Sequence, residues 1–370
     1  MKKIFLLLFV FSLAIAFAAC SNEPQVDAYE QHEQYEQIED LEVENEIPEA
    51  NEPDIYTNEY TPEEPIVELQ EPTGSNILGA LHRVEYGNNV AYLFGTIHGG
   101  HPHWFPLADI VEDALLRADI IAVEVDEIGD LDAFEDVMMA TTFLPNGLTW
   151  AEYLPEAEYT HLVNMMDAWG LAYDDINTMN PSLLVHTLVL TTATSLADFD
   201  ATIEASVDAY IASVAAERGL PVIGLESSTQ QVDILFNPPF EVMLAHIMTL
   251  MPPDDLVAYI MYESYELTLD ELAYLYENND FDAINDSFAT TLGAHIDDLY
   301  VTYMREIVSN WRSTYYANEI MRLLQVTDEP TTFFVAVGLS HINRSGAGEE
   351  FTDIVQQLKL AGFEPIPLWE

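Results

Sequence analysis

Apolar runs of four or more residues recur along this chain, and each ends at a turn or at a polar side chain. Leu78 to Tyr86 and Val90 to Gly95 flank the sequence Gly87-Asn88-Asn89, and this arrangement predicts a β-hairpin. Three later runs are almost entirely apolar, which is typical of strands that are buried on both faces of a sheet. These runs cover 120–126, 221–226 and 333–338, and a last strand is predicted over 363–368.

Between the strands, apolar residues recur at helical spacing. The pattern predicts helices over 106–118, 131–143, 155–168, 181–195 and 201–218, a mostly helical stretch over 228–325, and a helix over 349–360. Gly219 is placed to end one helix, whereas Pro238-Pro239 and Pro252-Pro253 are placed to begin two others. Because strands alternate with helices, we expect an α/β fold: a mixed central β-sheet with a strand-end active site, surrounded by helices and two large helical insertions.

The first twenty residues have the pattern of a secretory signal. Met1-Lys2-Lys3 is basic, the following residues to Phe17 are apolar, and Ala18-Ala19 precedes Cys20, the only cysteine of the chain. This pattern predicts a bacterial lipoprotein signal peptide over 1–20 and a lipid on Cys20; the alternative is an ordinary cleavage site with an idle thiol. A lipidated Cys20 would leave no thiol for a disulfide, a thiolate ligand or cysteine catalysis.

Residues 21–72 contain no Lys or Arg and are rich in Asp, Glu, Pro and Gln, which predicts a disordered acidic tether. The folded domain is expected over 73–370. The whole chain has 65 acidic residues against 10 Lys and Arg, a formal net charge of −55 at pH 7. This balance argues against nucleic acid as a partner, because phosphate contacts need clustered Lys and Arg. It also disfavours an anionic membrane surface, so we expect membrane contact only through the lipid on Cys20, with the domain on the extracytoplasmic side.

Four predicted strands end in side chains that can do chemistry: His98, Glu124, Glu226 and His341. Open α/β sheets bind ligands at the carboxyl ends of their strands, and neighbouring strands lie about 4.8 Å apart, so these groups can converge on one ion. Gly95 and Gly338, three residues before each histidine, are expected to let backbone or ligand approach closely.

Each of these residues also has a structural alternative. His98 or His341 taken singly could be a half-buried side chain with satisfied hydrogen bonds, and Glu124 could belong to a structural ion pair. Glu226 could accept hydrogen bonds at the start of the helix that begins near Ser227. His101 and His103 lie on the loop after His98 and are further candidate ligands.

Arginine is scarce, so its position is informative. Arg312 lies in a long helix predicted over 297–324, among tyrosines and a tryptophan. The side chain could polarise a substrate carbonyl or orient a catalytic glutamate. The alternative is a surface arginine that pairs with Glu306 or Glu319.

These motifs together resemble those of the TraB/GumN family, over about residues 76–369. That family is related to the Tiki metalloproteases and more distantly to erythromycin esterases and ChaN-like proteins. Two departures stand out, since Ser313 follows Arg312 where the family usually has asparagine, and the loop after His98 carries His101 and His103. The motifs, in chain order, are Tyr92-Leu-Phe-Gly-Thr-Ile-His98, Val123-Glu124-Val-Asp126, Gly219-Leu-Pro-Val-Ile-Gly-Leu-Glu226, Arg312-Ser-Thr-Tyr-Tyr-Ala-Asn-Glu-Ile320 and Val337-Gly-Leu-Ser-His341.

The resemblance implies a mixed α/β fold with a divalent-metal-dependent hydrolase site formed by His98, Glu124, Glu226, Arg312 and His341. We expect Zn, Mn or Co, held by His98 and His341 with one glutamate, for which Glu226 is the candidate. The other glutamate would act as general base and Arg312 would stabilise the oxyanion. Which glutamate has which role stays open.

The leading hypothesis from the sequence is an exported, lipid-anchored metallohydrolase, namely a peptidase acting on extracellular peptides or proteins. Two alternatives remain. One is a binding protein that sequesters a secreted peptide signal without cleaving it, and the other is a metal-independent esterase that uses His and Glu alone.

Overall fold

The computed structural model describes residues 75–97, 99–125, 131–196, 206–263, 268–294, 299–326, 329–342, 344 and 351–369. These residues belong to one compact unit within Thr73–Glu370. The predicted signal peptide, Cys20, the acidic tether and His98 lie outside the described residues.

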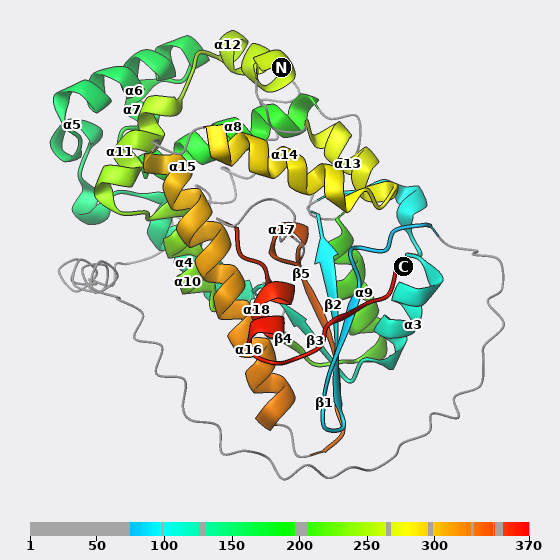
Figure 1. The fold of residues 1–370 in the computed structure, drawn as a ribbon. Coiled ribbons are helices and arrows are strands. Elements are labelled where there is room, and N and C mark those ends of the chain that lie inside the picture. Colours follow the sequence, from blue (N-terminus) through cyan, green and yellow to red (C-terminus); the bar gives the residue numbers. More distant parts are fainter. Residues whose placement is uncertain are drawn as a thin grey trace. The chain divides into compact units, whose positions relative to one another are not determined.

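A six-stranded mixed sheet forms the centre of the described part of the chain (Figure 1). Its order is β4-β3-β5-β2-β1-β6. Parallel pairing joins β4 to β3, β3 to β5 and β5 to β2, whereas β1 is antiparallel to both β2 and β6. The predicted α/β fold is therefore confirmed. The strands are β1 (His82–Tyr86), β2 (Asn89–Thr96), β3 (Ile120–Val123), β4 (Val222–Gly224), β5 (Thr332–Gly338) and β6 (Ile366–Pro367).

Several strands are shorter than the sequence pattern predicts, because pairing partners end before the apolar runs do. β4 pairs only with β3, over a three-residue register, and β6 pairs only with the start of β1. Beyond Val123 the chain leaves the regular ladder but stays close to its neighbour, since Glu226 N donates to Glu124 O at 2.9 Å. The two glutamates therefore follow adjacent strands.

Two long helical segments interrupt the sheet, as predicted. Between β3 and β4 lie α4 (Leu131–Thr142), α5 (Trp150–Tyr153), α6 (Glu156–Trp169), α7 (Tyr173–Ile176), α8 (Pro181–Leu196) and α9 (Val207–Arg218). Between β4 and β5 lie α10 (Ser228–Phe236), α11 (Phe240–Thr249), α12 (Pro253–Ala258), α13 (Leu269–Glu277), α14 (Phe281–Ala294), α15 (Leu299–Tyr303) and α16 (Arg312–Val326). The predicted boundary signals are confirmed, because Gly219 ends α9 with φ 65° and Pro239 and Pro252 stand at the N-caps of α11 and α12.

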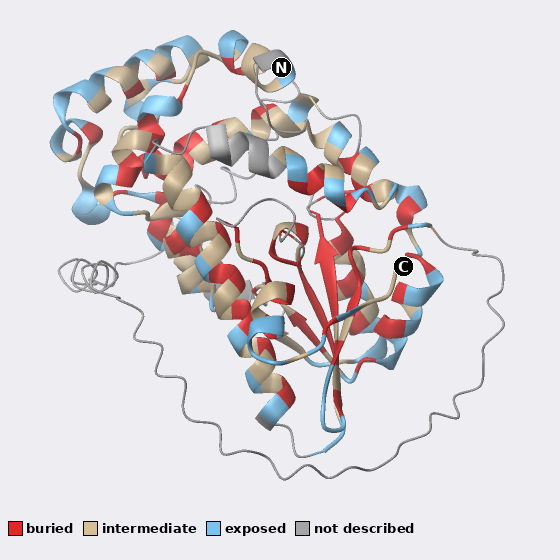
Figure 2. Cartoon of the chain, viewed as in Figure 1, coloured by how far each residue is buried: buried red, intermediate tan, exposed pale blue. Residues whose placement is uncertain are grey.

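Helices cover both faces of the sheet (Figure 1). On one face lie α3 (Asp109–Arg117) and α9, which are joined by a hydrogen bond from Tyr210 OH to Glu112 Oε1 at 2.7 Å. On the other face lie α16 and α18 (Ile354–Leu360). Figure 2 shows that the strands are mostly buried, whereas the outer faces of the helices are exposed.

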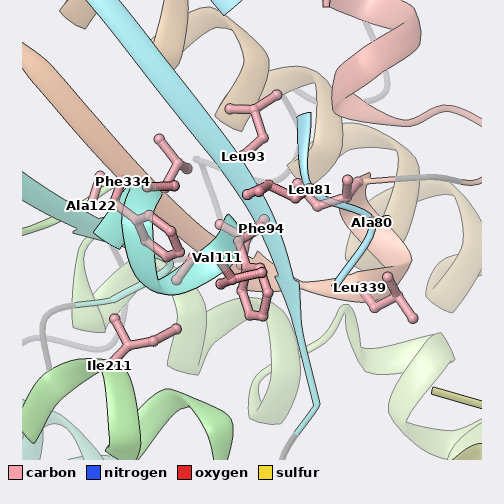
Figure 3. Packing of buried hydrophobic residues seen from close by; sticks show 14 of the residues in the cluster. Ala80, Leu81, Leu93, Phe94, Val111, Ala122, Ile211, Phe334 and Leu339 are labelled. Atoms are coloured by element: carbon pink, nitrogen blue, oxygen red, sulfur yellow. The ribbon is translucent and has the colours of Figure 1, made fainter. Parts of the chain in front are cut away.

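The core is continuous through the sheet. The rings of Phe94 in β2 and Phe334 in β5 lie 5.7 Å apart, and Val111 and Ile211 belong to the same cluster (Figure 3). Burial of these apolar side chains is the main favourable term that holds the strands and helices together. Among the described residues, no helix combines the length and the apolar composition that crossing a bilayer requires.

The long helix predicted over 297–324 is not one regular α-helix. A π-helical segment, Met304–Trp311, separates α15 from α16. π-Helical turns inside longer helices occur frequently at functional sites. Here the segment ends immediately before Arg312, and its buried side chains include Arg305 and Ser309. The buried face of this helix is therefore polar where a core helix would be apolar.

Candidate functional site

The parallel strands bring the predicted site residues to one edge of the sheet. Glu124 directly follows β3 and Glu226 follows β4, while His341 lies in the short helix α17 (Leu339–Ile342) that directly follows β5. The structure brings Glu124, Glu226 and His341 together with Arg312 of α16. The strand β2 pairs in register with β5 up to Thr96 opposite Gly338, two residues before His98.

Arg312 lies at the centre of this cluster and is buried. Its Nε contacts both oxygens of Glu226, at 3.2 and 3.3 Å, and its Nη2 donates to Glu226 Oε1 at 2.6 Å. The same Nη2 donates to Glu124 Oε2 at 2.8 Å. The remaining terminal nitrogen, Nη1, faces His341 Nε2 at 3.5 Å. One guanidinium therefore joins the groups delivered by three strand ends, and Arg312 is not the surface arginine that the sequence left open.

The carboxylate of Glu226 is the most buried charged group of the cluster. Its side chain has no exposed area, and besides Arg312 it accepts a hydrogen bond from Tyr316 OH at 2.6 Å. It does not cap the following helix, because the hydroxyl of Ser227 accepts from Gln230 N in that position. Glu226 is therefore held by two side chains of α16, and its own side chain is not exposed to water.

Glu124, in contrast, retains an exposed edge. Its side chain is 15% exposed, while one oxygen accepts from Gly338 N at 2.7 Å and the other contacts Arg312 and, at 3.4 Å, Gln231 Nε2. The backbone of Gly338 lies so close that a Cβ there would be 3.1 Å from Glu124 Oε1. Of the two glutamates, Glu124 is the one that water or a substrate reaches.

His341 is oriented by a serine on α16. Its Nδ1 lies 2.9 Å from Ser313 Oγ, and its Nε2 lies 3.9 Å from Glu124 Oε1. The hydroxyl of Ser313 in turn donates to the carbonyl oxygen of Ser309 at 2.8 Å. The ring of His341 also packs edge-on against Tyr316, with centroids 5.1 Å apart. Two side chains of α16, Ser313 and Tyr316, therefore set the orientation of the imidazole ring.

Gly95 and Gly338 have the role that their spacing predicts. At Gly95, a Cβ would lie 2.6 Å from Leu339 Cδ1 and 2.9 Å from Leu339 Cα, at the start of the helix that carries His341. A side chain at Gly95 would therefore push α17 away from β2. The expected close approach of backbone is confirmed at Gly95, whereas at Gly338 the group that approaches is the carboxylate of Glu124.

The charges of the cluster fix its donors. Burial lowers the pKa of Arg312, but the carboxylates of Glu124 and Glu226 and the ring of Tyr316 outweigh burial, so the pKa rises above its usual value. Burial, together with the neighbouring Glu124 and Glu226, raises the pKa of Tyr316 well above its usual value. Arg312 therefore stays cationic and Tyr316 stays a protonated phenol at any physiological pH.

The loop histidines have other partners. The ring of His101 stacks on His103 with centroids 5.0 Å apart and packs edge-on against Trp104, while His103 pairs with Glu277 at 2.8 Å. Within the described ranges, no group of three or more His, Cys, Asp or Glu side chains is placed to hold a metal ion. Since His98 lies outside those ranges, the ligand roles predicted for His98, His101, Glu226 and His341 stay predictions.

Sequence reasoning missed two members of the cluster. Tyr316 and Ser313 lie on the same helix as Arg312, four residues and one residue further along. The spacing of four from Arg312 to Tyr316 was a usable signal, because residues four apart share a helix face. Ser313 was marked only as a departure from the asparagine usual in the resembled family, and its contact with His341 could not be inferred from the sequence.

Comparisons with known proteins agree with the resemblance inferred from the motifs. The model described as the TraB/PrgY/gumN family matches residues 80–365, which includes every residue of the cluster. No curated protein and no solved structure matches the chain.

Proposed function

Because this chain belongs to the TraB/PrgY/gumN family, we propose that its strand-end cluster is the active site of a divalent-metal-dependent hydrolase acting on peptides or proteins. The observation that carries the proposal is the convergence of Glu124, Glu226 and His341 on the buried guanidinium of Arg312. Ionisable groups of this kind gather at the strand ends of an open α/β sheet when they serve a ligand or a reaction.

The residues present suit a divalent ion in the chemistry of their donors. Imidazole nitrogen is a common ligand of Zn and of similar ions, and His341 Nε2 lies 3.9 Å from Glu124 Oε1, the carboxylate assigned below as general base. His341, together with the predicted ligand His98, would hold the ion. When bound, such an ion lowers the pKa of a bound water to about 7.

We assign the catalytic roles of the protein's own side chains according to how deeply each is buried. Glu124, with its exposed edge, accepts the proton from the attacking water. Arg312 supplies hydrogen-bond donors for the negative charge that develops on the substrate carbonyl oxygen. Glu226, the sequence-based candidate for a metal ligand, has both oxygens within reach of Arg312 Nε, and we assign it the role of holding that guanidinium in place.

The test measures metal and turnover in the same preparations. The full-length protein, purified in detergent, is analysed for bound metal and incubated with a peptide library whose fragments are identified by mass spectrometry. We expect bound divalent metal and cleavage in the wild type, and loss of both in His98→Ala and in His341→Ala, with the fold retained. Full activity of either variant contradicts the proposed site. Depletion of a peptide without fragments indicates the binding protein instead.

One observation favours a second candidate, the metal-independent His/Glu esterase. Arg312 donates to both carboxylates, so each carboxylate already has a cationic partner among the side chains of the protein. A chelator separates the two candidates. Hydrolysis that persists after exhaustive treatment with a chelator supports the esterase, whereas loss of hydrolysis that added zinc, manganese or cobalt restores supports the metal-dependent enzyme.

We also propose that the protein is exported and anchored by a lipid on Cys20. The support is the basic start, the apolar run and the Ala18-Ala19-Cys20 sequence at the beginning of the chain. Labelling of cells with a fatty-acid analogue tests this proposal. The wild type is expected to take up label and to sediment with membranes, and Cys20→Ala is expected to do neither.

A further inference from the structure

We propose that Ser313 is a positioning residue that holds His341 in the tautomer with the proton on Nδ1, so that the lone pair of Nε2 faces Glu124 and Arg312. The assignment concerns a residue that the sequence marks only as a departure from the asparagine usual in the family. Its consequence for catalysis rests on the function proposed above, but the tautomer itself does not.

One short contact sets the tautomer, and a second, longer contact agrees with it. The first is at Ser313, whose hydroxyl has a single proton and donates it to Ser309 O at 2.8 Å. The 2.9 Å contact between Ser313 Oγ and His341 Nδ1 then needs its proton from the imidazole. Nδ1 is therefore the protonated nitrogen of the neutral ring.

The second contact is at the opposite nitrogen. Arg312 Nη1 lies 3.5 Å from His341 Nε2, and a guanidinium has donors but no acceptor. Nε2 must therefore accept in this contact. The hydrogen bonds run in one direction, from Arg312 through the imidazole and Ser313 to the carbonyl oxygen of Ser309.

The end of the π-helical segment supplies the last acceptor in this series of hydrogen bonds. The carbonyl oxygen of Ser309 accepts both the backbone N–H of Arg312 and the hydroxyl of Ser313. The side chain of Ser309 is held separately, because its hydroxyl oxygen accepts from Arg344 Nη1. Ser309 is thus fixed at both its backbone and its side chain. The hydroxyl of Ser313, a residue with no exposed area, is therefore directed at a fixed acceptor.

Both proposed chemistries need the Nε2 lone pair of His341, which an ion or a proton would take in place of the 3.5 Å contact with Arg312 Nη1. A metal-ligating histidine usually donates its other ring N–H to a protein acceptor, which fixes the tautomer and the ring orientation. A histidine that accepts a proton in a metal-independent reaction needs the same lone pair, directed at the same place. Ser313 therefore matters for either reaction, although it contacts neither substrate nor ion.

The direct test is nitrogen NMR of the full-length protein with ¹⁵N-labelled histidine. The two ring nitrogens of a neutral imidazole resonate in separate ranges according to which one carries the proton, and the signals of His341 are identified by their loss in His341→Gln. We expect Nδ1–H in the wild type. In Ser313→Ala, loss of one neutral hydrogen bond is expected to move the tautomer ratio about 3- to 10-fold towards Nε2–H.

Thr314→Ala is the matched control. Thr314 is the next residue of the same helix, and its hydroxyl likewise bonds back to a carbonyl oxygen, that of Asn310, at 3.1 Å. This variant is expected to leave the His341 signals unchanged. An unchanged tautomer ratio in Ser313→Ala, an Nε2–H tautomer in the wild type, or an equal change in Thr314→Ala overturns the inference.

A second measurement separates this inference from the proposed function. Equilibrium dialysis with zinc alone is expected to show an affinity about 10- to 100-fold lower in Ser313→Ala than in the wild type or Thr314→Ala. If the wild type binds no zinc and cleaves no peptide, the proposed function fails while the NMR result still decides the role of Ser313. Unchanged zinc affinity together with an altered tautomer contradicts the catalytic consequence alone.

Discussion

Replacing Arg312 with methionine is expected to destabilise the fold strongly, because it leaves the carboxylate of Glu226 buried without its cation. The Glu226 side chain has no exposed area, and after the change the hydrogen-bond donor that it keeps in the cluster is the neutral Tyr316 OH. Removing one partner of a buried ion pair costs about 3–5 kcal/mol. Glu124 adds little to this cost, because its side chain is 15% exposed and keeps the bond from Gly338 N.

Urea denaturation followed by circular dichroism measures this loss as a change in the free energy of unfolding. The double variant Arg312→Met with Glu226→Gln removes the stranded charge, so it is expected to recover about 2 kcal/mol relative to Arg312→Met alone. The matched control is Arg322→Met on the same helix. Arg322 is 54% exposed and pairs with Glu319, so its loss is expected to cost less than about 1 kcal/mol.

The role of the buried ion pair is refuted if Arg312→Met lowers the free energy of unfolding no more than Arg322→Met does. It is also refuted if the double variant loses as much stability as the two single variants added together, since coupled partners of one buried pair must deviate from additivity.

Three further outcomes follow from the structure. Glu124→Gln is expected to reduce peptide hydrolysis about 10²- to 10⁴-fold while it changes the free energy of unfolding by less than about 1 kcal/mol, and paired activity and urea measurements check this. Gly95→Ala places a Cβ 2.9 Å from Leu339 Cα and is expected to lower the free energy of unfolding by about 1–3 kcal/mol in the same assay. Gly338→Ala places a Cβ 3.1 Å from the Glu124 carboxylate and is expected to reduce activity with little change in the free energy of unfolding. Burial, with His186 nearby, lowers the pKa of His246 from 6.5 to about 3, so the unfolded chain binds a proton first as pH falls. The stability that this residue contributes is complete above pH 6.5 and is lost towards pH 3, by about 1.4 kcal/mol per pH unit. His246→Phe is expected to remove that slope when the free energy of unfolding is measured against pH.

The sequence pattern predicted most of the elements and the edge of the sheet where the site lies. The nearly continuous apolar runs before Glu124 and His341 are typical of strands buried on both faces, and parallel pairing then places their carboxyl ends together. Helix boundaries were predictable where a residue has a strong local preference, as at Gly219 and Pro239.

The division of roles between the two glutamates was not predictable in the same way. Glu124 and Glu226 both follow short buried strands, and the sequence gives no reason to separate them. Their exposure differs because α16 packs directly over Glu226, a contact between residues 86 positions apart. Burial set by such a distant segment is absent from any local pattern.

The π-helical segment was unpredictable for a related reason. The apolar side chains within Met304–Trp311 are spaced as in an α-helix. The change from α-helical to π-helical hydrogen bonding adds only one residue to each hydrogen-bonded turn. The segment ends immediately before Arg312, the first residue of α16. The contact between Ser313 and His341 joins residues 28 positions apart and could likewise be recognised only in three dimensions.

The position of β5 in the sheet also determines when this protein can fold. β5 lies between β3 and β2, so that it joins the pair β4-β3 to the group β2-β1-β6. It is nevertheless the fifth strand in sequence and begins only at Thr332. Until β5 has been made, the described strands that precede it form two separate pairs, β4-β3 and β2-β1, which have open edges. Contacts between such distant segments slow folding, so the half-finished chain is the state in which this protein is most exposed to aggregation and to chaperones.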